Sequence, residues 1–138
     1  MNDRRDFLQL AALLAVAAPT TLQAADEPLK ARGEIARYPL SGALAGNDAV
    51  LVDLVAQPGA ASAGGGHRHP GMVLGYVIEG AYNFAINGEA PRVIKAGETF
   101  FEEAGALHSG SGSADPAKPA HLLAFMIVPT GQPLVLPA

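Results

Sequence analysis

The chain has 138 residues, enough for one domain, and carries a formal charge of −4 with a pI near 5.4. This acidic balance, without any block of basic residues, argues against a nucleic-acid partner. The chain has no cysteine, which excludes disulfides, thiolate ligands and cysteine nucleophiles. A metal site in this protein must therefore use histidine, carboxylate, backbone or water.

The first 25 residues are predicted to be an export signal. Arg4 and Arg5 precede an apolar run at residues 10–18, and small residues follow, which is the order typical of a secretory signal. The paired arginines followed by Phe-Leu resemble the twin-arginine signal, which indicates export of the folded protein to the periplasm. The alternatives are an ordinary secretory signal and an uncleaved anchor, although the run is short for a bilayer.

Residues 26–138 are predicted to form one all-β domain. Apart from a polar stretch at its start, the segment consists of short strand-like runs separated by turn residues, and Asn87-Gly88 is a strong hairpin signal. No stretch has helical periodicity over ten or more residues. This pattern predicts a sandwich or barrel. The expected strands are residues 35–40, 49–57, 72–79, 82–86, 92–95, 98–102, 107–108 and 121–128.

Two histidines stand in the middle of the chain. His67 and His69 follow a glycine run at residues 64–66 and precede the strongest predicted strand. In an extended chain the side chains at i and i+2 point to the same face, so these imidazoles converge. Two convergent imidazoles are a typical start of a metal site. The alternative is a surface histidine beside a hydrogen-bonded structural one.

The region from residue 67 to residue 112 resembles the two motifs of the cupin family. The first motif has two histidines one residue apart, a glutamate four or five residues later and a closing glycine. The second has a glycine, then Pro-X-Gly, a histidine and an asparagine. The resemblance covers about residues 35–130 and implies a double-stranded β-helix, or jelly-roll cupin barrel, with a metal inside. The matching residues are His67, His69 and Gly80 in the first motif and Gly97, Gly105 and His108 in the second.

The sequence departs from the family's pattern at three places. Val73, or Leu74 with the longer spacing, stands where the family has its metal-binding glutamate. Glu103 replaces the proline of the second motif, and Gly112 replaces its asparagine. The family's site of three histidines and one glutamate therefore does not carry over, whereas the three histidines do.

The resemblance thus implies one divalent metal ion held by His67, His69 and His108, with iron, manganese, zinc, nickel and copper all open. Three neutral imidazoles leave positions for water, substrate or dioxygen. The pattern looks like that of cupin dioxygenases that cleave diketones or oxidise thiols. Loss of the glutamate raises the charge at the metal by one unit, which favours an anionic substrate such as an enolate or carboxylate.

Glu102 is predicted to be the catalytic residue. It lies six residues before His108 in the same alternation phase, so in a regular strand it points into the barrel near the metal. There it can ligate the metal, orient a histidine or act as a base. The alternative is a rim carboxylate in water. Glu98 and Glu103 are expected to be exposed, and His121 to be structural or on the surface.

Apolar residues are predicted around the site and on the outside of the barrel. The last strand is apolar on both faces, which predicts a homodimer, because an apolar outer face needs cover and cupins commonly dimerise through a sheet. Three residues in the phase of His69 form an inner wall, and three aromatic residues add to the pocket or belong to the core. These residues are Val73, Gly75 and Val77, and Phe84, Phe100 and Phe125.

The sequence therefore predicts a small periplasmic metalloenzyme that acts on a small organic molecule. The chemistry expected is of the dioxygenase type or of the isomerase or lyase type, and fold alone does not decide between them. One alternative is a non-catalytic module that binds a small ligand or a metal, and another is a structural barrel with a vestigial site. A pocket open above the imidazoles favours catalysis, and a collapsed site favours the structural barrel.

Overall fold

The computed structural model describes residues 33–58 and 66–138, and these residues form strands and turns with no α-helix. The predicted export signal, residues 1–25, lies outside the described residues, as do most of the polar stretch that follows and Gly64 and Gly65. The elements are β1 (Gly33–Pro39), the 3-10 turn η1 (Gly42–Leu44), β2 (Asn47–Ala56), β3 (His67–Arg68), β4 (Met72–Glu79), β5 (Ala81–Ile86), β6 (Arg92–Lys95), β7 (Thr99–Glu102), β8 (Leu107–Gly110), β9 (Ala120–Pro129) and β10 (Leu136–Pro137).

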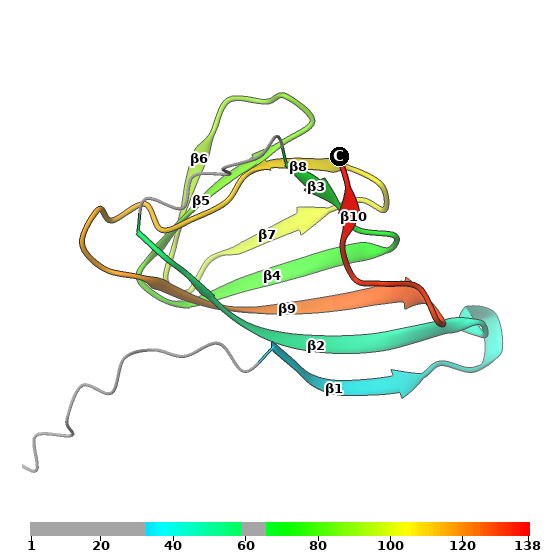
Figure 1. Cartoon of the computed structure of the whole chain (residues 1–138). Coiled ribbons are helices and arrows are strands. Elements are labelled where there is room, and N and C mark those ends of the chain that lie inside the picture. The colour runs from blue at the N-terminus through cyan, green and yellow to red at the C-terminus, as the bar shows by residue number, and fades with distance from the viewer. Residues whose placement is uncertain (1–32, 59–65) are drawn as a thin grey trace, which may run out of the picture.

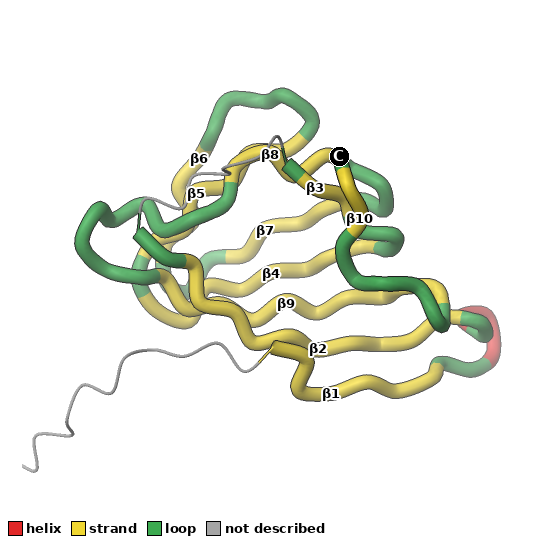
Figure 2. Tube along the Cα trace, in the orientation of Figure 1, coloured by secondary structure: helices red, strands yellow, loops and turns green. Residues whose placement is uncertain are grey.

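The strands form two five-stranded sheets that face each other (Figure 1, Figure 2). One sheet has the order β1-β2-β9-β4-β7 and the other has the order β10-β3-β8-β5-β6. Neighbouring strands pair antiparallel. This architecture confirms the predicted all-β barrel, and it encloses an interior to which both sheets contribute side chains.

Alternation of apolar residues positions the strands, because successive side chains point to opposite faces of a sheet. In β4, Val73 and Val77 are 2% and 0% exposed, whereas Leu74 and Ile78 between and after them are 43% and 42% exposed. The buried residues form two clusters inside the barrel. One contains Val77, Tyr82, Phe84, Ile94, Phe100, Ala120 and Leu122, and the other contains Val50, Val52, Val73, Ala124, Met126 and Val128.

The hairpin predicted at Asn87-Gly88 joins β5 to β6. Asn87 has a φ of 51° and Gly88 a φ of 78°, as a tight hairpin turn with two left-handed residues requires. The turn is closed by the amide of Glu89, which donates to the carbonyl of Ile86 at 2.9 Å. Asparagine and glycine are the residues that adopt this conformation at least cost.

A buried carboxylate ties three elements together at the start of β2. Asp48 accepts one hydrogen bond from Arg37 Nη1 on β1 and another from Thr130 Oγ1 after β9, both at 2.8 Å. Arg37 also forms an ion pair with Glu34 at 2.8 Å. These bonds lower the pKa of Asp48 from its ordinary value, the one from Arg37 contributing most.

The C-terminal tail is more ordered than its proline-rich sequence predicts. Its last strand, β10, pairs with β3, so that Leu136 lies opposite Arg68 and Pro137 opposite His67. β3 in turn pairs with β8, which places His67 opposite His108. These two-residue strands have no periodic pattern of their own, and the tail thus borders the site that the sequence predicts.

The outer face of the first sheet carries large apolar side chains. Phe101, Leu74, Phe125 and Leu51 lie opposite one another across β7, β4, β9 and β2. Phe101, Leu74 and Phe125 are 49%, 43% and 38% exposed. The expectation that Phe125 adds to the pocket is therefore wrong: in β9 the inner face is occupied by Ala124 and Met126, and Phe125 points outward.

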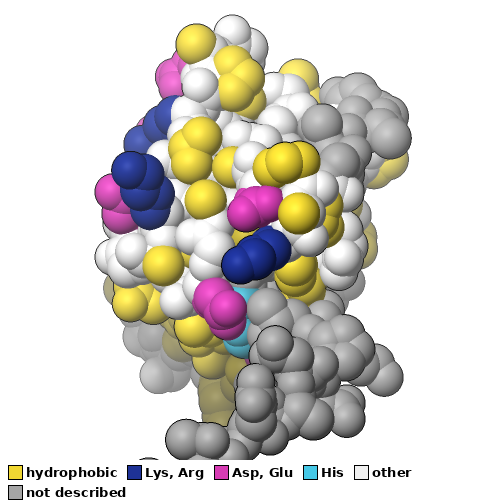
Figure 3. All heavy atoms as spheres, turned by 90° about the vertical axis from the view of Figure 1, so that its left-hand side faces the viewer, with side chains coloured by type: hydrophobic (Ala, Val, Ile, Leu, Met, Phe, Trp, Pro, Cys, Tyr) yellow, Lys and Arg dark blue, Asp and Glu magenta, His cyan; other side chains and the backbone are white. Residues whose placement is uncertain are grey.

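The described residues include no helix long and apolar enough to cross a membrane. On the face that Figure 3 shows, acidic side chains lie beside basic ones, with hydrophobic side chains between them.

Candidate metal centre

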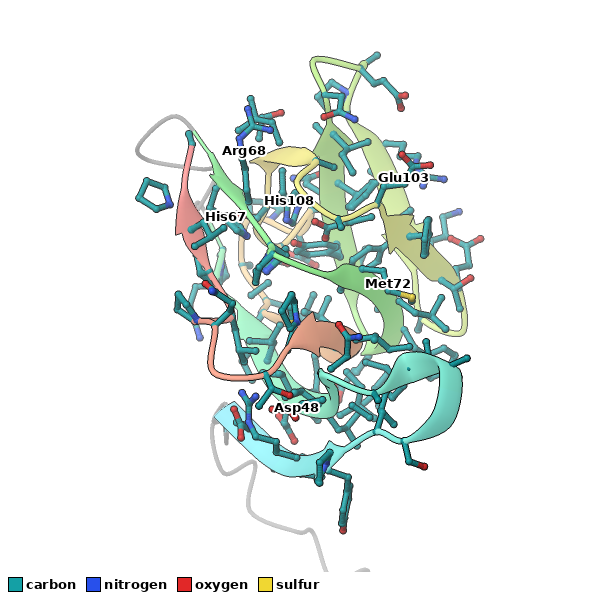
Figure 4. All side chains as sticks on the ribbon, turned by 90° about the vertical axis from the view of Figure 1, so that its right-hand side faces the viewer. Asp48, His67, Arg68, Met72, Glu103 and His108 are labelled. Carbon is teal, nitrogen blue, oxygen red and sulfur yellow. The ribbon has the colours of Figure 1, made fainter. Side chains whose placement is uncertain are left out.

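The fold brings His67, His69 and His108 together. Each offers one ring nitrogen to a group whose members all lie within 4.8 Å of one another. The ring centroids of His67 and His108 are 4.9 Å apart, and Figure 4 shows the two side chains next to each other on adjacent strands. His69 follows β3 by one residue and joins them because alternation returns its side chain to the inner face.

Local bonds fix the orientation of His69. Its Nδ1 donates to the carbonyl of Leu134 at 2.6 Å, which leaves the lone pair on Nε2 facing the interior. That Nε2 lies 3.1 Å from His67 Nε2. Two ligand nitrogens each about 2.1 Å from one ion, at roughly right angles, are about 3 Å apart, so the spacing suits a shared divalent ion. Among the described residues, this is the one such group of histidines and carboxylates.

His108 is buried between a phenol and a carboxylate. The Tyr82 hydroxyl lies 3.2 Å from its Nε2, and Glu102 Oε1 lies 3.4 Å from its Nδ1. Glu102 Oε2 lies 3.8 Å from His69 Nε2. Within the described part of the chain, Glu102 Oε2 and His108 Nδ1 are buried and have no hydrogen-bond partner. Because buried polar atoms are normally paired, these two atoms fit a cation bound among the imidazoles.

Burial sets the protonation of the centre. It lowers the pKa of His108 to about 4, with help from the nearby charge of His67, and it lowers the pKa of His67 and His69 as well. The histidines are therefore neutral at neutral pH, which metal binding requires. Burial raises the pKa of Glu102 to about 7, and together with the Glu102 charge it raises the pKa of Tyr82.

A cavity of about 440 Å³ opens onto the three imidazoles. The histidines, Glu102 and Tyr82 form one polar group in its wall, and Gln57 and Ser111 are the other polar side chains that line it. Most of the remaining wall is apolar and comes from the first sheet and the C-terminal tail. It includes Val52, Val73, Phe100, Leu122, Ala124, Met126 and Leu134.

The other sequence-predicted residues lie as follows. Glu102 points inward and is 2% exposed, whereas Glu98 and Glu103 are on the surface. His121 lies on the outer side of β9, where its Nε2 donates to the buried carboxylate of Asp53 at 3.0 Å. Val73, Gly75 and Val77 are buried on the inner face, and of the three only Val73 lines the cavity.

Sequence reasoning missed two contributors to the site, Tyr82 and Leu134. The inward phase of Tyr82, which it shares with Phe84, was a usable signal for the first. Nothing local marks Leu134, because a backbone carbonyl acts here and the tail reaches the site only through its pairing with β3.

A sequence model of the cupin domain matches residues 53–126, more than half of the chain. The chain belongs to the cupin family. The matched region contains the three histidines and Glu102, so the centre lies in the part of the cupin that the family shares. No curated protein sequence matches this cupin significantly.

Solved structures share the cupin fold at low sequence identity. A cupin-like protein of Thermotoga maritima is 21% identical over 65% of this chain, with a TM-score of 0.55, and this chain spans 64% of its length. A double-stranded β-helix protein of Klebsiella pneumoniae is 23% identical over 80% of this chain and 90% of its own, with a TM-score of 0.54. An oxalate decarboxylase is 18% identical over 67% of this chain and 24% of its own, with a TM-score of 0.51.

Proposed function

We propose that this cupin is a metal-dependent enzyme that binds one divalent ion at His67, His69 and His108 and acts on a small amphipathic molecule. The observation that supports it best is the placement of three neutral imidazoles in the wall of an open, mostly apolar cavity. The metal when bound supplies a Lewis acid or a redox centre. The expected reaction is oxidation or cleavage with dioxygen, or isomerisation or elimination.

The lining of the cavity indicates the form of the substrate. Its polar groups are concentrated at the histidines, Glu102 and Tyr82, and a divalent ion there attracts a carboxylate, enolate or similar anionic head. The apolar walls of Leu122 and Met126 suit a hydrocarbon or aromatic body. Oxalate, which the decarboxylase above is named for, is a two-carbon diacid and would leave most of a cavity of about 440 Å³ unfilled.

We place Glu102 among the catalytic residues of this centre because its carboxyl faces the same space as the imidazoles. It is held in the interior by β7, and its oxygens lie close to both His69 and His108. A carboxyl in that position touches the metal or the reacting atoms of a molecule in the cavity. Tyr82 positions His108 and narrows the polar end of the cavity.

A ligand series tests the proposed substrate class. Straight-chain carboxylates of increasing length are titrated into the metal-loaded protein by calorimetry. The affinity is expected to rise about fourfold for each added methylene, since burying one contributes about 0.8 kcal/mol, until the chain fills the cavity. Replacing Ala124 with leucine should end the rise at a shorter chain. Affinity that does not change with chain length would contradict an amphipathic substrate.

Turnover separates the enzyme from the alternative of a binding module. Ligands that bind are incubated with the iron-loaded protein while oxygen uptake is recorded, and with the zinc- or manganese-loaded protein while products are analysed. Metal-dependent turnover supports the enzyme. Tight, metal-dependent binding without turnover of any bound ligand would favour a non-catalytic cupin that captures a small molecule.

We also propose a homodimer in the periplasm. The support for the dimer is the apolar outer face of the first sheet, where Leu74, Tyr76 and Ile78 on β4 are 43%, 45% and 42% exposed. Contiguous exposed apolar side chains of this kind are typical of an interface. A second copy can cover them by twofold packing of the same face. The support for the periplasm is the arrangement of the first 25 residues.

A further inference from the structure

We propose that Glu102 is the fourth ligand of the metal, and that it replaces from the neighbouring strand the glutamate that the first cupin motif lacks here. The inference rests on the proposed metal centre and specifies its ligand set. In the sequence, Val73 occupies the position of the glutamate in the first motif, and a carboxylate appears instead 29 residues later, within the span of the second motif.

The register of the first sheet places these two positions side by side. Val73 on β4 and Glu102 on β7 are direct cross-strand partners. Directly opposed residues of an antiparallel pair have Cβ atoms about 4.5–5.5 Å apart and point to the same face. Both are 2% exposed on the inner face, whereas Leu74, the other candidate for the motif position, is 43% exposed on the outer face. The carboxylate thus stands directly opposite the motif position, on the neighbouring strand.

The carboxylate oxygens lie where a ligand is needed. Glu102 Oε2 is 3.8 Å from His69 Nε2 and Oε1 is 3.4 Å from His108 Nδ1, so the group stands between two of the three imidazoles. Since His69 Nε2 carries a lone pair, it offers Glu102 no proton. A charged carboxylate beside nitrogen lone pairs needs a proton or a metal cation between them, and a divalent ion there pairs with the carboxylate and the imidazoles together.

No other described group neutralises Glu102. Among the described arginines and lysines only Arg37 forms ion pairs, and it lies on β1, at the opposite edge of the first sheet from β7 and Glu102. Oε2 accepts no hydrogen bond from any described residue. Burying a carboxylate without a hydrogen bond or a permanent counter-charge lowers the stability of the fold. An apolar side chain would therefore suit this position better if its role were purely structural.

The ligand set changes the charge of the centre. Three neutral imidazoles leave a divalent ion with a net charge of +2, and a bound carboxylate lowers it to +1. Glu102 therefore supplies the negative charge that a glutamate at position 73 would have supplied. The ion still attracts an anionic head group, but its bound water is less acidic than at a site of three histidines alone.

The test compares Glu102→Gln, Glu102→Val, the exchange variant Val73→Glu/Glu102→Val and the control Glu103→Gln. Affinity for Co²⁺ is measured by competition with a chelator, and the visible spectrum of bound Co²⁺ reports the ligands. Both Glu102 variants should lose more than about 100-fold in affinity, beyond the 10–100-fold typical of residues that only orient a ligand. The exchange variant should regain most of this loss and the wild-type spectrum. The control Glu103→Gln, at an exposed position, should leave the affinity and the spectrum unchanged.

A second readout separates a ligand from a structural hydrogen-bonding residue. Without metal, Glu102→Val should melt above the wild type, because it removes an unpaired buried carboxylate; with saturating Co²⁺ the order should reverse. If the wild type binds metal and the Glu102 variants keep its affinity and spectrum, the assignment of Glu102 as a ligand is overturned. An exchange variant no better than Glu102→Val would also overturn it. A wild-type protein that binds no metal would overturn the proposed function itself.

Discussion

Gly75 is a position at which a single methyl group should disturb the centre of the barrel. It lies on the inner face of β4, opposite Phe100 on β7, and the phenyl ring lies over it. A Cβ built on Gly75 would stand 2.1, 2.2 and 2.5 Å from the Cζ, Cε1 and Cε2 atoms of Phe100. Ordinary carbon contacts are about 3.5–4.0 Å, so Gly75→Ala forces the ring to move.

The displaced ring has little free space. Its centroid is 4.7 Å from that of Phe84 and 5.3 Å from that of Tyr82, whose hydroxyl contacts His108. Overpacking of a core typically costs about 1–3 kcal/mol. For a domain of this size that corresponds to a fall of roughly 5–20 °C in the melting temperature. Thermal and urea unfolding followed by circular dichroism measure the loss.

A double-mutant cycle attributes the loss to Phe100. Leucine at position 100 removes most of the ring atoms that the new methyl group meets, so Gly75→Ala should cost less than half as much in a Phe100→Leu background. A Gly75→Ala protein as stable as the wild type would refute the reasoning. So would an equal cost in both backgrounds, because the strain would then lie elsewhere.

Three further predictions concern acid stability, assembly and export. Because its lowered pKa makes Asp48 stabilising when charged, Asp48→Asn should melt below the wild type at pH 7, with the gap closing as the pH falls below about 4; a gap independent of pH would contradict this. Light scattering at micromolar concentration should give a dimer that Leu74→Arg or Phe125→Arg dissociates, and a monomeric wild type would refute it. Lysines at Arg4 and Arg5 should hold the precursor in the cytoplasm, and efficient export of that variant would indicate the general secretory route.

The parts of the fold that follow local patterns were predictable. β4 and β6 have the bounds that alternation and turn residues predict, and the hairpin at Asn87-Gly88 has the left-handed conformations that these two residues favour. The motif spacing likewise brought out the three histidines that the structure gathers. In each case a few consecutive residues carry the signal.

What the sequence did not reveal depends on pairing between distant residues. The two-residue strands β3 and β10 have no period, so the contact of Leu134 with His69 was invisible. β9 is apolar on both faces, and its pattern alone could not show that Phe125 points outward. The adjacency of Val73 and Glu102 requires the register of β4 against β7, which no local feature determines.

The measurement that tests the metal centre most directly is the metal content of purified protein by mass spectrometry across histidine variants. The wild type and His121→Ala, which changes a histidine on the outer side of β9, should each carry one divalent ion per chain. His67→Ala, His69→Ala and His108→Ala should each lose it during purification, since the two imidazoles and the Glu102 carboxylate that remain hold an exchangeable ion less tightly. Full occupancy in the His108→Ala protein would contradict the three-histidine centre.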